Sequence, residues 1–349
     1  MSPPLQPGAA PLARVVEGAR LDLNESAYPP LPAVAAVLRA GIPDTNRYPD
    51  FLPDRTRRHI AEHLGLPDEQ ITVGAGATGV AVSALQAVAR RAAARGIAAP
   101  AMVTALPTFD GYPILAEMVG LRVDAVGLNA DGGVDPAAML AAITAETVVA
   151  VLCSPHNPTG SVIGERALRD FLDAVPRHVT VLLDQAYIEF CDSPPDLHRI
   201  LGGRDNVLIL RTFSKAYGLA ALRVGYGIGG AVAADVRRFE VPFAVGPAAM
   251  AAVPVALAAN NQLAERVAST RTERARMAAL LEDIGAPVLP SQGNFLFLPG
   301  PDGIAIGRLL RSCGVATKEC GMAGTRITIG DRSATDRVLA SLRTTALTA

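Results

Sequence analysis

Residues 206–229 read "NVLILRTFSKAYGLAALRVGYGIG", and one lysine, Lys215, interrupts a run of small and apolar side chains. The segments 206–211 and 223–229 have the length and the Val, Ile and Leu content that is typical of buried strands. No carboxylate occurs between Asp205 and Asp235, so no residue nearby in the sequence neutralises Lys215. The stretch therefore predicts two buried strands whose connection carries a cation without a local counter-ion.

Apolar runs of strand length alternate with helical patterns from about residue 55 to 240. Further strands are expected at 70–74, 101–106, 122–128, 147–155 and 179–184, and helices near 77–95, 110–119, 135–143, 164–174 and 231–239. Strands that are buried on both faces read as continuous apolar runs, as these do. The alternation predicts an α/β fold with a mixed, mostly parallel seven-stranded sheet between helices.

The 349-residue chain is too long for one small domain. We expect an N-terminal arm and part of a small domain over 1–44, a large domain over 45–245, and the rest of an α+β small domain over 246–349. The first twenty residues read as irregular, and the helical stretch 246–283 contains Pro254, which predicts a kink or break.

The composition excludes several classes of protein. Half of the residues are hydrophobic and the net charge is −1, so the chain is globular and carries no electrostatic signature for nucleic acid or anionic membranes. Its four cysteines form no C-x-x-C pair, which argues against a zinc ribbon or a redox motif. Without an apolar leader pattern or a long uncharged apolar run, we expect a cytoplasmic protein with no membrane span.

The segment "GAGATG" (74–79) matches the glycine-rich fingerprint of dinucleotide-binding sites. That reading needs an acidic residue after the next strand, and 91–109 contains neither Asp nor Glu. Small residues at a helix N-terminus still expose backbone N–H groups, so the phosphate of another cofactor fits. A glycine-rich turn without a ligand is the alternative.

The segment "HIAEH" (59–63) matches a zinc-metalloprotease pattern, with both histidines on one helix face. Arg57 and Arg58 adjoin it, and a short pattern of this kind is common by chance. A solvated amphipathic helix is the favoured interpretation, and no metal site is predicted.

Polar residues follow the predicted strands at their C-terminal ends, where ligands bind in open α/β sheets. These residues are Asn157, Asp184, Tyr187 and Lys215. Singly, Asp184 could cap a helix, Asn157 could begin a turn and Lys215 could be solvated. Jointly, an amine that can hold an aldehyde and an acid that can hold a protonated ring nitrogen predict pyridoxal 5′-phosphate as the cofactor.

Three segments carry a family resemblance: "SPHNPTG" (154–160), "VLLDQAYIEF" (181–190) and "TFSKAYGLAALRVGY" (212–226). They resemble the signature segments of the class I and II, fold-type I aminotransferases. Within that family the chain is most similar to the branch of histidinol-phosphate aminotransferase and its aromatic aminotransferase relatives. The resemblance runs in order from 21–26 to 325–330, nearly the whole chain.

The resemblance implies a role for each matching residue on the cofactor side. Lys215 would hold the cofactor covalently and move the substrate proton, Asp184 would pair with the ring nitrogen, and Asn157 and Tyr187 would bind the ring oxygen. Phe109 would stack on the ring, unless it is a core residue. The phosphate contacts would come from Ala77, Thr78, Thr212, Ser214 and Arg223. Apolar neighbours and the nearby Arg223 should lower the pKa of Lys215.

The resemblance also implies a homodimer in which Tyr48 reaches the phosphate of the neighbouring subunit's cofactor. The alternative for Tyr48 is packing within its own proline-rich loop. No further macromolecular partner is expected.

On the substrate side, Arg326 would bind the substrate α-carboxylate and Asn294 would assist, unless Arg326 is a surface residue of its strand. Asn24, Tyr112 and Lys318 complete the predicted substrate set. Two positions depart from the family pattern: the motif "LNEN" reads "LNES" at 23–26, and Gln185 stands where a Glu is common. At a third, Lys318 would meet a phosphate as a point charge and not with the planar guanidinium of an arginine.

The function that we expect is transfer of an amino group between an imidazole-type or aromatic amino acid or amine and a 2-oxo acid such as 2-oxoglutarate. Two alternatives stay open because a fold does not determine a reaction. One is another pyridoxal-phosphate reaction, such as decarboxylation, elimination or cyclisation, in specialised amino-acid biosynthesis. The other is a non-catalytic protein that kept the fold.

Overall fold

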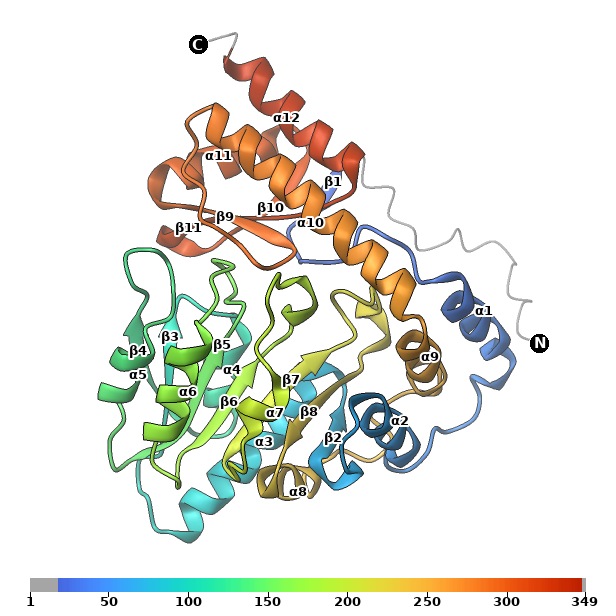
Figure 1. Cartoon of the computed structure of the whole chain (residues 1–349), viewed down its shortest axis with the longest axis vertical. Helices are drawn as coiled ribbons and strands as arrows, with labels where there is room; N and C mark the ends of the chain where they lie inside the picture. The colour runs from blue at the N-terminus through green and yellow to red at the C-terminus, as the bar shows by residue number, and fades with distance from the viewer. Residues whose placement is uncertain (1–17, 347–349) are drawn as a thin grey trace, which may run out of the picture.

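The computed structural model describes residues 18–346 (Figure 1). The irregular arm that the sequence predicts for the first twenty residues, and the leader region, therefore lie almost entirely outside the described residues. No helix in the described part of the chain is long and apolar enough to cross a membrane.

A seven-stranded sheet forms the centre of the larger unit, with the strand order β2-β8-β7-β6-β5-β3-β4. Its strands are β2 (Ile71–Gly74), β3 (Ala101–Leu106), β4 (Arg122–Gly127), β5 (Thr147–Cys153), β6 (Thr180–Asp184), β7 (Val207–Thr212) and β8 (Gly225–Gly229). Strand β8 runs antiparallel to both of its neighbours, and the remaining pairs are parallel. The predicted mixed, mostly parallel sheet is confirmed.

Alternate side chains of the central strands enter two separate hydrophobic cores, one on each face of the sheet. In β5, Ala150 and Leu152 belong to one core, whereas Val149 and Val151 belong to the other. The helices of the second core are α3 (Gly76–Ala94), α4 (Gly111–Met118) and α8 (Ala231–Arg237). Those of the first are α5 (Pro136–Ala141), α6 (Glu165–Ala174) and α7 (Leu197–Leu201), with α1, α2 and α9 described below. Both faces of the strands are therefore apolar.

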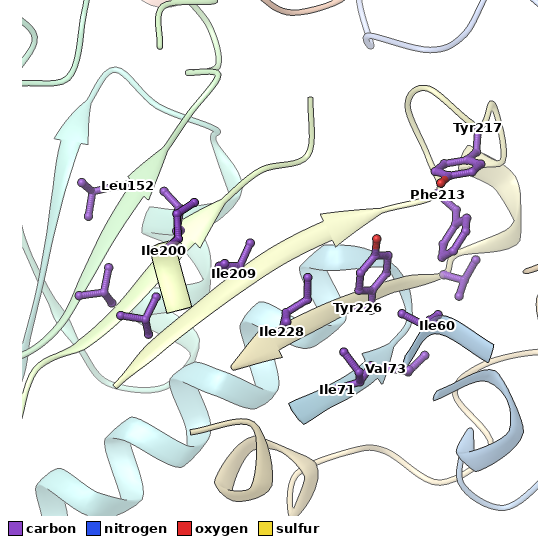
Figure 2. Packing of buried hydrophobic residues seen from close by; sticks show 14 of the residues in the cluster. Ile60, Ile71, Val73, Leu152, Ile200, Ile209, Phe213, Tyr217, Tyr226 and Ile228 are labelled. Atoms are coloured by element: carbon purple, nitrogen blue, oxygen red, sulfur yellow. The ribbon is translucent and has the colours of Figure 1, made fainter. Parts of the chain in front are cut away.

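The first core extends along the sheet from β5 to β2, as Figure 2 shows for Leu152, Ile209, Ile228 and Ile71. At its β2 end it reaches α1 (Pro32–Ala40), α2 (Asp54–Leu64) and α9 (Pro247–Ala258). The next helix, α10 (Asn260–Asp283), leads to the smaller unit. Helix α9 continues through Pro254, and the break falls after Ala258, because α9 packs against α1 and α2. The first core therefore includes residues on both sides of the predicted boundary at 245/246. The predicted bounds of the large and small domains stay a prediction.

The smaller unit contains a four-stranded sheet with the order β1-β10-β11-β9. Its elements are β1 (Ala19–Leu21), β9 (Phe295–Pro299), α11 (Gly300–Ser312), β10 (Val315–Glu319), β11 (Gly324–Thr328) and α12 (Arg332–Ala346). Strand β1 pairs in parallel with β10, so an N-terminal segment joins the C-terminal unit. The residues that follow β1 are thereby placed beside the carboxyl ends of the large sheet's strands.

Candidate active site

A cavity of about 520 Å³ lies at the carboxyl ends of the central strands, with lining residues from both units. The predicted site residues that line it are Asn24, Ala77, Thr78, Phe109, Tyr112, Asn157, Asp184, Tyr187, Thr212, Ser214, Lys215, Arg223, Lys318 and Arg326. Residues that are far apart in the sequence therefore meet at one site, at the sheet edge where the sequence predicts it.

A second cavity of about 570 Å³ lies at the opposite edge of the large sheet. Its cationic side chains include Arg91, which is paired with Asp235 at 2.9 Å, and Arg204, which is paired with Asp173. The lining of this cavity contains no lysine. Its chemistry does not resemble that of the first cavity, and we place the active site in the first.

Asp184 ends strand β6 and is held by neutral donors. Its Oδ1 accepts the N–H of Ala186 at 2.9 Å, and its Oδ2 accepts the Tyr112 hydroxyl at 2.6 Å and the Cys153 thiol at 3.9 Å. Burial raises the pKa of Asp184, against the lowering effect of these hydrogen bonds. Asp184 forms no ion pair within 4.0 Å in the described chain. A protonated ring nitrogen would supply the positive charge that a buried carboxylate needs.

Lys215 lies in the connection after β7, and its Nζ donates a 3.1 Å hydrogen bond to the carbonyl oxygen of Leu23. Burial, followed by the positive charges of Arg326 and Arg223, lowers the pKa of Lys215 to about 8, although Glu25 and Asp184 act in the opposite direction. The predicted lowering by apolar surroundings and Arg223 is confirmed. A neutral amine, the form that attacks an aldehyde, is thus accessible near neutral pH.

An anion cradle lies beside Lys215. Helix α3 begins at Gly76 without a side-chain cap, so the first-turn N–H groups of Ala77 and Thr78 have no intrahelical acceptor. Gly76 has a φ of +76°, and a Cβ at this position would lie 2.5 Å from Nη2 of Arg223. A guanidinium and free backbone donors at a helix N-terminus are the groups that bind a phosphate.

Two hydroxyl side chains complete this cradle. The Thr212 hydroxyl donates to Oγ of Ser214 at 3.0 Å, and Arg223 Nη1 lies 3.5 Å from the same oxygen. Arg223 itself has a φ of 52°, in the left-handed region, and its Nη1 also donates to the carbonyl oxygen of Ala220 at 2.9 Å. The backbone turn thereby directs the guanidinium toward the cradle.

Arg326, on strand β11, lies between the two units. Its Nη1 donates to Oδ1 of Asn157 at 2.5 Å and its Nη2 to the carbonyl oxygen of Asp22 at 2.6 Å. Its Nε is buried and has no hydrogen-bond partner among the described residues. The guanidinium is therefore fixed in place through both of its terminal nitrogens.

Asn24 connects the loop after β1 to both units. Its Nδ2 donates to the Tyr187 hydroxyl oxygen at 3.0 Å, and its Oδ1 accepts the Thr328 hydroxyl at 3.0 Å. Burial raises the pKa of Tyr187 to about 12, so its hydroxyl stays protonated and can donate. Asn294 does not line the cavity, and its Nδ2 donates to the carbonyl oxygen of Asn24 at 3.2 Å.

The aromatic residues of the predicted set have different positions. Phe109 lines the cavity and meets the Tyr112 ring edge-on at 5.7 Å, and a Cβ at Gly111 would lie 2.3 Å from the Phe109 ring. Tyr48 lies outside this chain's own cavity, is 85% exposed, and packs against Phe243 with a centroid distance of 5.0 Å. The roles that the resemblance assigns to these residues stay predictions.

Sequence reasoning missed several polar residues that line the cavity, among them Asp22, Asp110 and Cys153. Cys153 and Tyr112 share the Oδ2 atom of Asp184, and Asp110 forms an ion pair with Lys318 at 2.8 Å. The carbonyl oxygen of Asp22 holds Arg326. Of these residues, only Asp110 could have been suspected from the sequence, because it follows Phe109 directly. Its ion-pair partner, Lys318, could not be inferred without the fold.

A lysine, a buried acid and an anion cradle at the carboxyl edge of this sheet define a pyridoxal-phosphate-dependent enzyme of fold type I. The chain belongs to the class I and II aminotransferases, because the model of that family matches residues 17–342. It is thus an aminotransferase that uses pyridoxal phosphate, and the alternative of a non-catalytic protein is set aside.

The chain is 38% identical over 346 residues to an aromatic amino acid aminotransferase of Thermobifida fusca, covering 98% of this chain and 94% of that one. It is 36% identical over 336 residues to an enzyme with the same name from Corynebacterium glutamicum, covering 95% of both chains. Among solved structures it is similar to the histidinol-phosphate aminotransferase of Sinorhizobium meliloti in complex with pyridoxal-5′-phosphate. The TM-score is 0.83, the identity is 28%, and 94% of this chain and 91% of that chain are covered.

Proposed function

We propose that this enzyme transfers the amino group of an aromatic amino acid to a 2-oxo acid such as 2-oxoglutarate. The donor becomes the corresponding aromatic 2-oxo acid, and the acceptor becomes an amino acid. The names of the curated relatives support the aromatic donor over the histidinol-phosphate type.

The observation that carries the proposal is the position of Arg326, which lines the cavity and is held by Asn157 and by the carbonyl oxygen of Asp22. A guanidinium that is fixed at the cavity wall can bind the carboxylate of an α-amino acid with charged hydrogen bonds. Histidinol phosphate has no carboxylate at this position. Its phosphate would face the same two cations, Arg326 and Lys318, so the names of the relatives and not the cations support the aromatic donor.

Pyridoxal phosphate, when bound, supplies an electron sink for the negative charge that develops at the substrate Cα. In our proposal Lys215 holds the cofactor and carries the proton to and from that carbon. Asp184 keeps the ring nitrogen protonated, and Asn157 and Tyr187 orient the ring oxygen. Thr212, Ser214, Arg223 and the first turn of α3 hold the phosphate.

We further propose that the enzyme is a homodimer in which Tyr48 completes the neighbouring site. Tyr48, Phe51 and Phe243 form a cluster of contacting rings that are 85%, 61% and 44% exposed. Contiguous exposed apolar side chains of this kind mark protein–protein contacts. We also propose a cytoplasmic location, which is supported by the four free cysteines, because disulfides are rare in that compartment.

The test is a screen of amino donors against the purified holoenzyme, with conversion of the bound cofactor to its amine form measured by absorbance. Phenylalanine and tyrosine should convert it, and histidinol phosphate should not. Release of CO₂ without conversion would instead show a decarboxylase. In an Arg326→Leu variant, conversion by phenylalanine should weaken strongly. Conversion by 2-phenylethylamine, which lacks the carboxylate, should weaken little, and equal losses would contradict the role of Arg326.

A further inference from the structure

The second cavity, of about 570 Å³, lies where the parallel strands of the large sheet begin. Val148 is near the start of β5, Thr180 is the first residue of β6, and Asn206 directly precedes β7. Helix α3 connects the two cavities, because its first turn lines the active site and its C-cap residue, Arg95, lines the second cavity. Its 19 residues span roughly 28 Å. A ligand in the second cavity is therefore too far from Lys215 to be a substrate there.

Positive side chains outnumber negative ones in the lining of this cavity. Four arginines and one histidine stand against three aspartates. Two of the arginines are used in the ion pairs with Asp173 and Asp235 that are described above. The other two, Arg95 and Arg177, have no ion pair and no side-chain hydrogen bond within the described part of the chain. Only one lining carboxylate, that of Asp205, remains beside these two cations, so the cavity carries a surplus of positive charge.

The deeper part of the cavity is apolar. Its buried lining residues are mostly aliphatic: Val88, Ala92, Val148, Leu172, Val175 and Val232. The two unpaired arginines are exposed and therefore lie toward the solvent. An apolar interior with a few polar groups is typical of sites for small organic molecules, and a cavity of this volume is large enough for one. The charge and the apolar lining together match an apolar molecule that carries a carboxylate.

The paired arginines hold the walls of the cavity in place. Arg91 donates to Asp235 at 2.9 Å and to the hydroxyl of Thr180 at 2.5 Å, which fixes the end of α3 to the start of β6. Arg204 pairs with Asp173 and also donates to the carbonyl oxygen of Ile200 at 2.8 Å. A cavity whose walls are already held needs little ordering when a ligand binds, and this lowers the cost of binding.

From this arrangement we infer that the second cavity is a ligand site for a small molecule with an apolar body and a carboxylate. The aliphatic lining takes the apolar body, and Arg95 and Arg177 bind the carboxylate with charged hydrogen bonds. The inference goes beyond the proposed function, because no residue of the active site takes part. It assigns to the enzyme a binding site that is separate from the catalytic one.

The test measures the binding of 3-phenylpropionate to the holoenzyme by calorimetry. The wild type should show two binding events per chain, one in each cavity. Arg326→Leu should remove the event in the active site and keep the other, which then reports the second cavity alone. In that variant, 3-phenylpropanamide, which lacks the charge, and propionate, which lacks the ring, should each bind at least about tenfold more weakly.

Replacing the two unpaired arginines tests the site directly. Adding Arg95→Gln and Arg177→Gln to Arg326→Leu should raise the dissociation constant of 3-phenylpropionate by about ten- to hundredfold, as expected for lost charged hydrogen bonds. Arg90→Gln is the matched control, because Arg90 is an exposed arginine of α3 that lines neither cavity, and it should change nothing.

Three outcomes would overturn the inference: loss of all binding in Arg326→Leu, equal binding of the acid and its amide, or unchanged binding without Arg95 and Arg177. None of these outcomes depends on the amino donor. If phenylalanine and tyrosine fail to convert the wild-type cofactor, the proposed function is wrong, but the event in the second cavity should still be lost with the two arginines.

Discussion

The hydroxyl of Tyr112 donates a 2.6 Å hydrogen bond to Oδ2 of Asp184, across 72 positions of the sequence. Tyr112 is 2% exposed, and burial raises its pKa well above the usual value, so the hydroxyl keeps its proton. The sequence assigned Tyr112 to the substrate, and that role stays a prediction. In the structure, its hydroxyl is hydrogen-bonded to Asp184, the carboxylate that is proposed to hold the cofactor ring.

Replacing Tyr112 by Phe should therefore weaken cofactor binding. The hydrogen bond lowers the pKa of Asp184, so its loss makes the carboxylate easier to protonate and less able to hold a proton on the ring nitrogen. Hydrogen bonds to charged groups contribute about 1.5–3 kcal/mol, which predicts roughly a ten- to hundredfold rise in the dissociation constant of pyridoxal phosphate. Titration of the apoenzyme measures it. Tyr28→Phe, at a half-buried tyrosine that does not line the cavity, is the control, and an unchanged affinity in Tyr112→Phe would contradict this role.

The pKa of Lys215 predicts how cofactor attachment depends on pH. The folded protein lowers this pKa from 10.5 to about 8, so the reactive neutral amine becomes the major form as the pH rises through about 8. The rate of covalent attachment to the apoenzyme, followed by stopped-flow absorbance, should rise over that range and then level off. In Arg326→Leu the midpoint should move upward, because the charge of Arg326 lowers the pKa of Lys215. A rate that kept rising toward pH 10.5 would show an ordinary lysine.

Much of this fold and site could be predicted because the signals are local. Continuous apolar runs mark strands that are buried on both faces, and the carboxyl ends of parallel strands meet at one edge, which brings Asn157, Asp184 and Lys215 together. The contacts of Tyr112 with Asp184 and of Asp110 with Lys318 depend on how α4 packs against the two sheets. No periodicity or motif in the sequence encodes such pairings.

Strand β1 illustrates the same limit on another scale. Its three residues, Ala19–Leu21, are too few to show a strand pattern in the sequence. They nevertheless pair with β10 and place Asn24 against Tyr187. Helix α9 likewise continues through Pro254 because tertiary packing against α1 and α2 outweighs the local preference for a break. Local propensity alone could not predict either outcome.

Gly76→Ala should weaken the binding of the cofactor phosphate. A Cβ would lie 2.5 Å from Nη2 of Arg223 and would displace the guanidinium from the cradle. The affinity for pyridoxal phosphate should fall, whereas that for pyridoxal, which has no phosphate, should change little. Gly96→Ala is the control, because its φ of +69° is equally unfavourable for alanine but no atom lies within 4 Å of the added Cβ. A similar loss for both forms of the cofactor would point to a general distortion and not to the phosphate.

Mixing two variant chains tests whether Tyr48 acts in its own site or in the neighbouring one. Tyr48 is 85% exposed and does not line the cavity of its own chain, which supports a contribution across the dimer. Tyr48→Phe should bind the cofactor weakly, and Lys215→Ala should not attach it. In a two-fold dimer, random mixing gives about half hybrids, each with one site that combines Lys215 from one chain with Tyr48 from the other. If Tyr48 acts across the interface, a class of sites with wild-type cofactor affinity appears only after mixing. If it acts within its own chain, no such class appears at any mixing ratio.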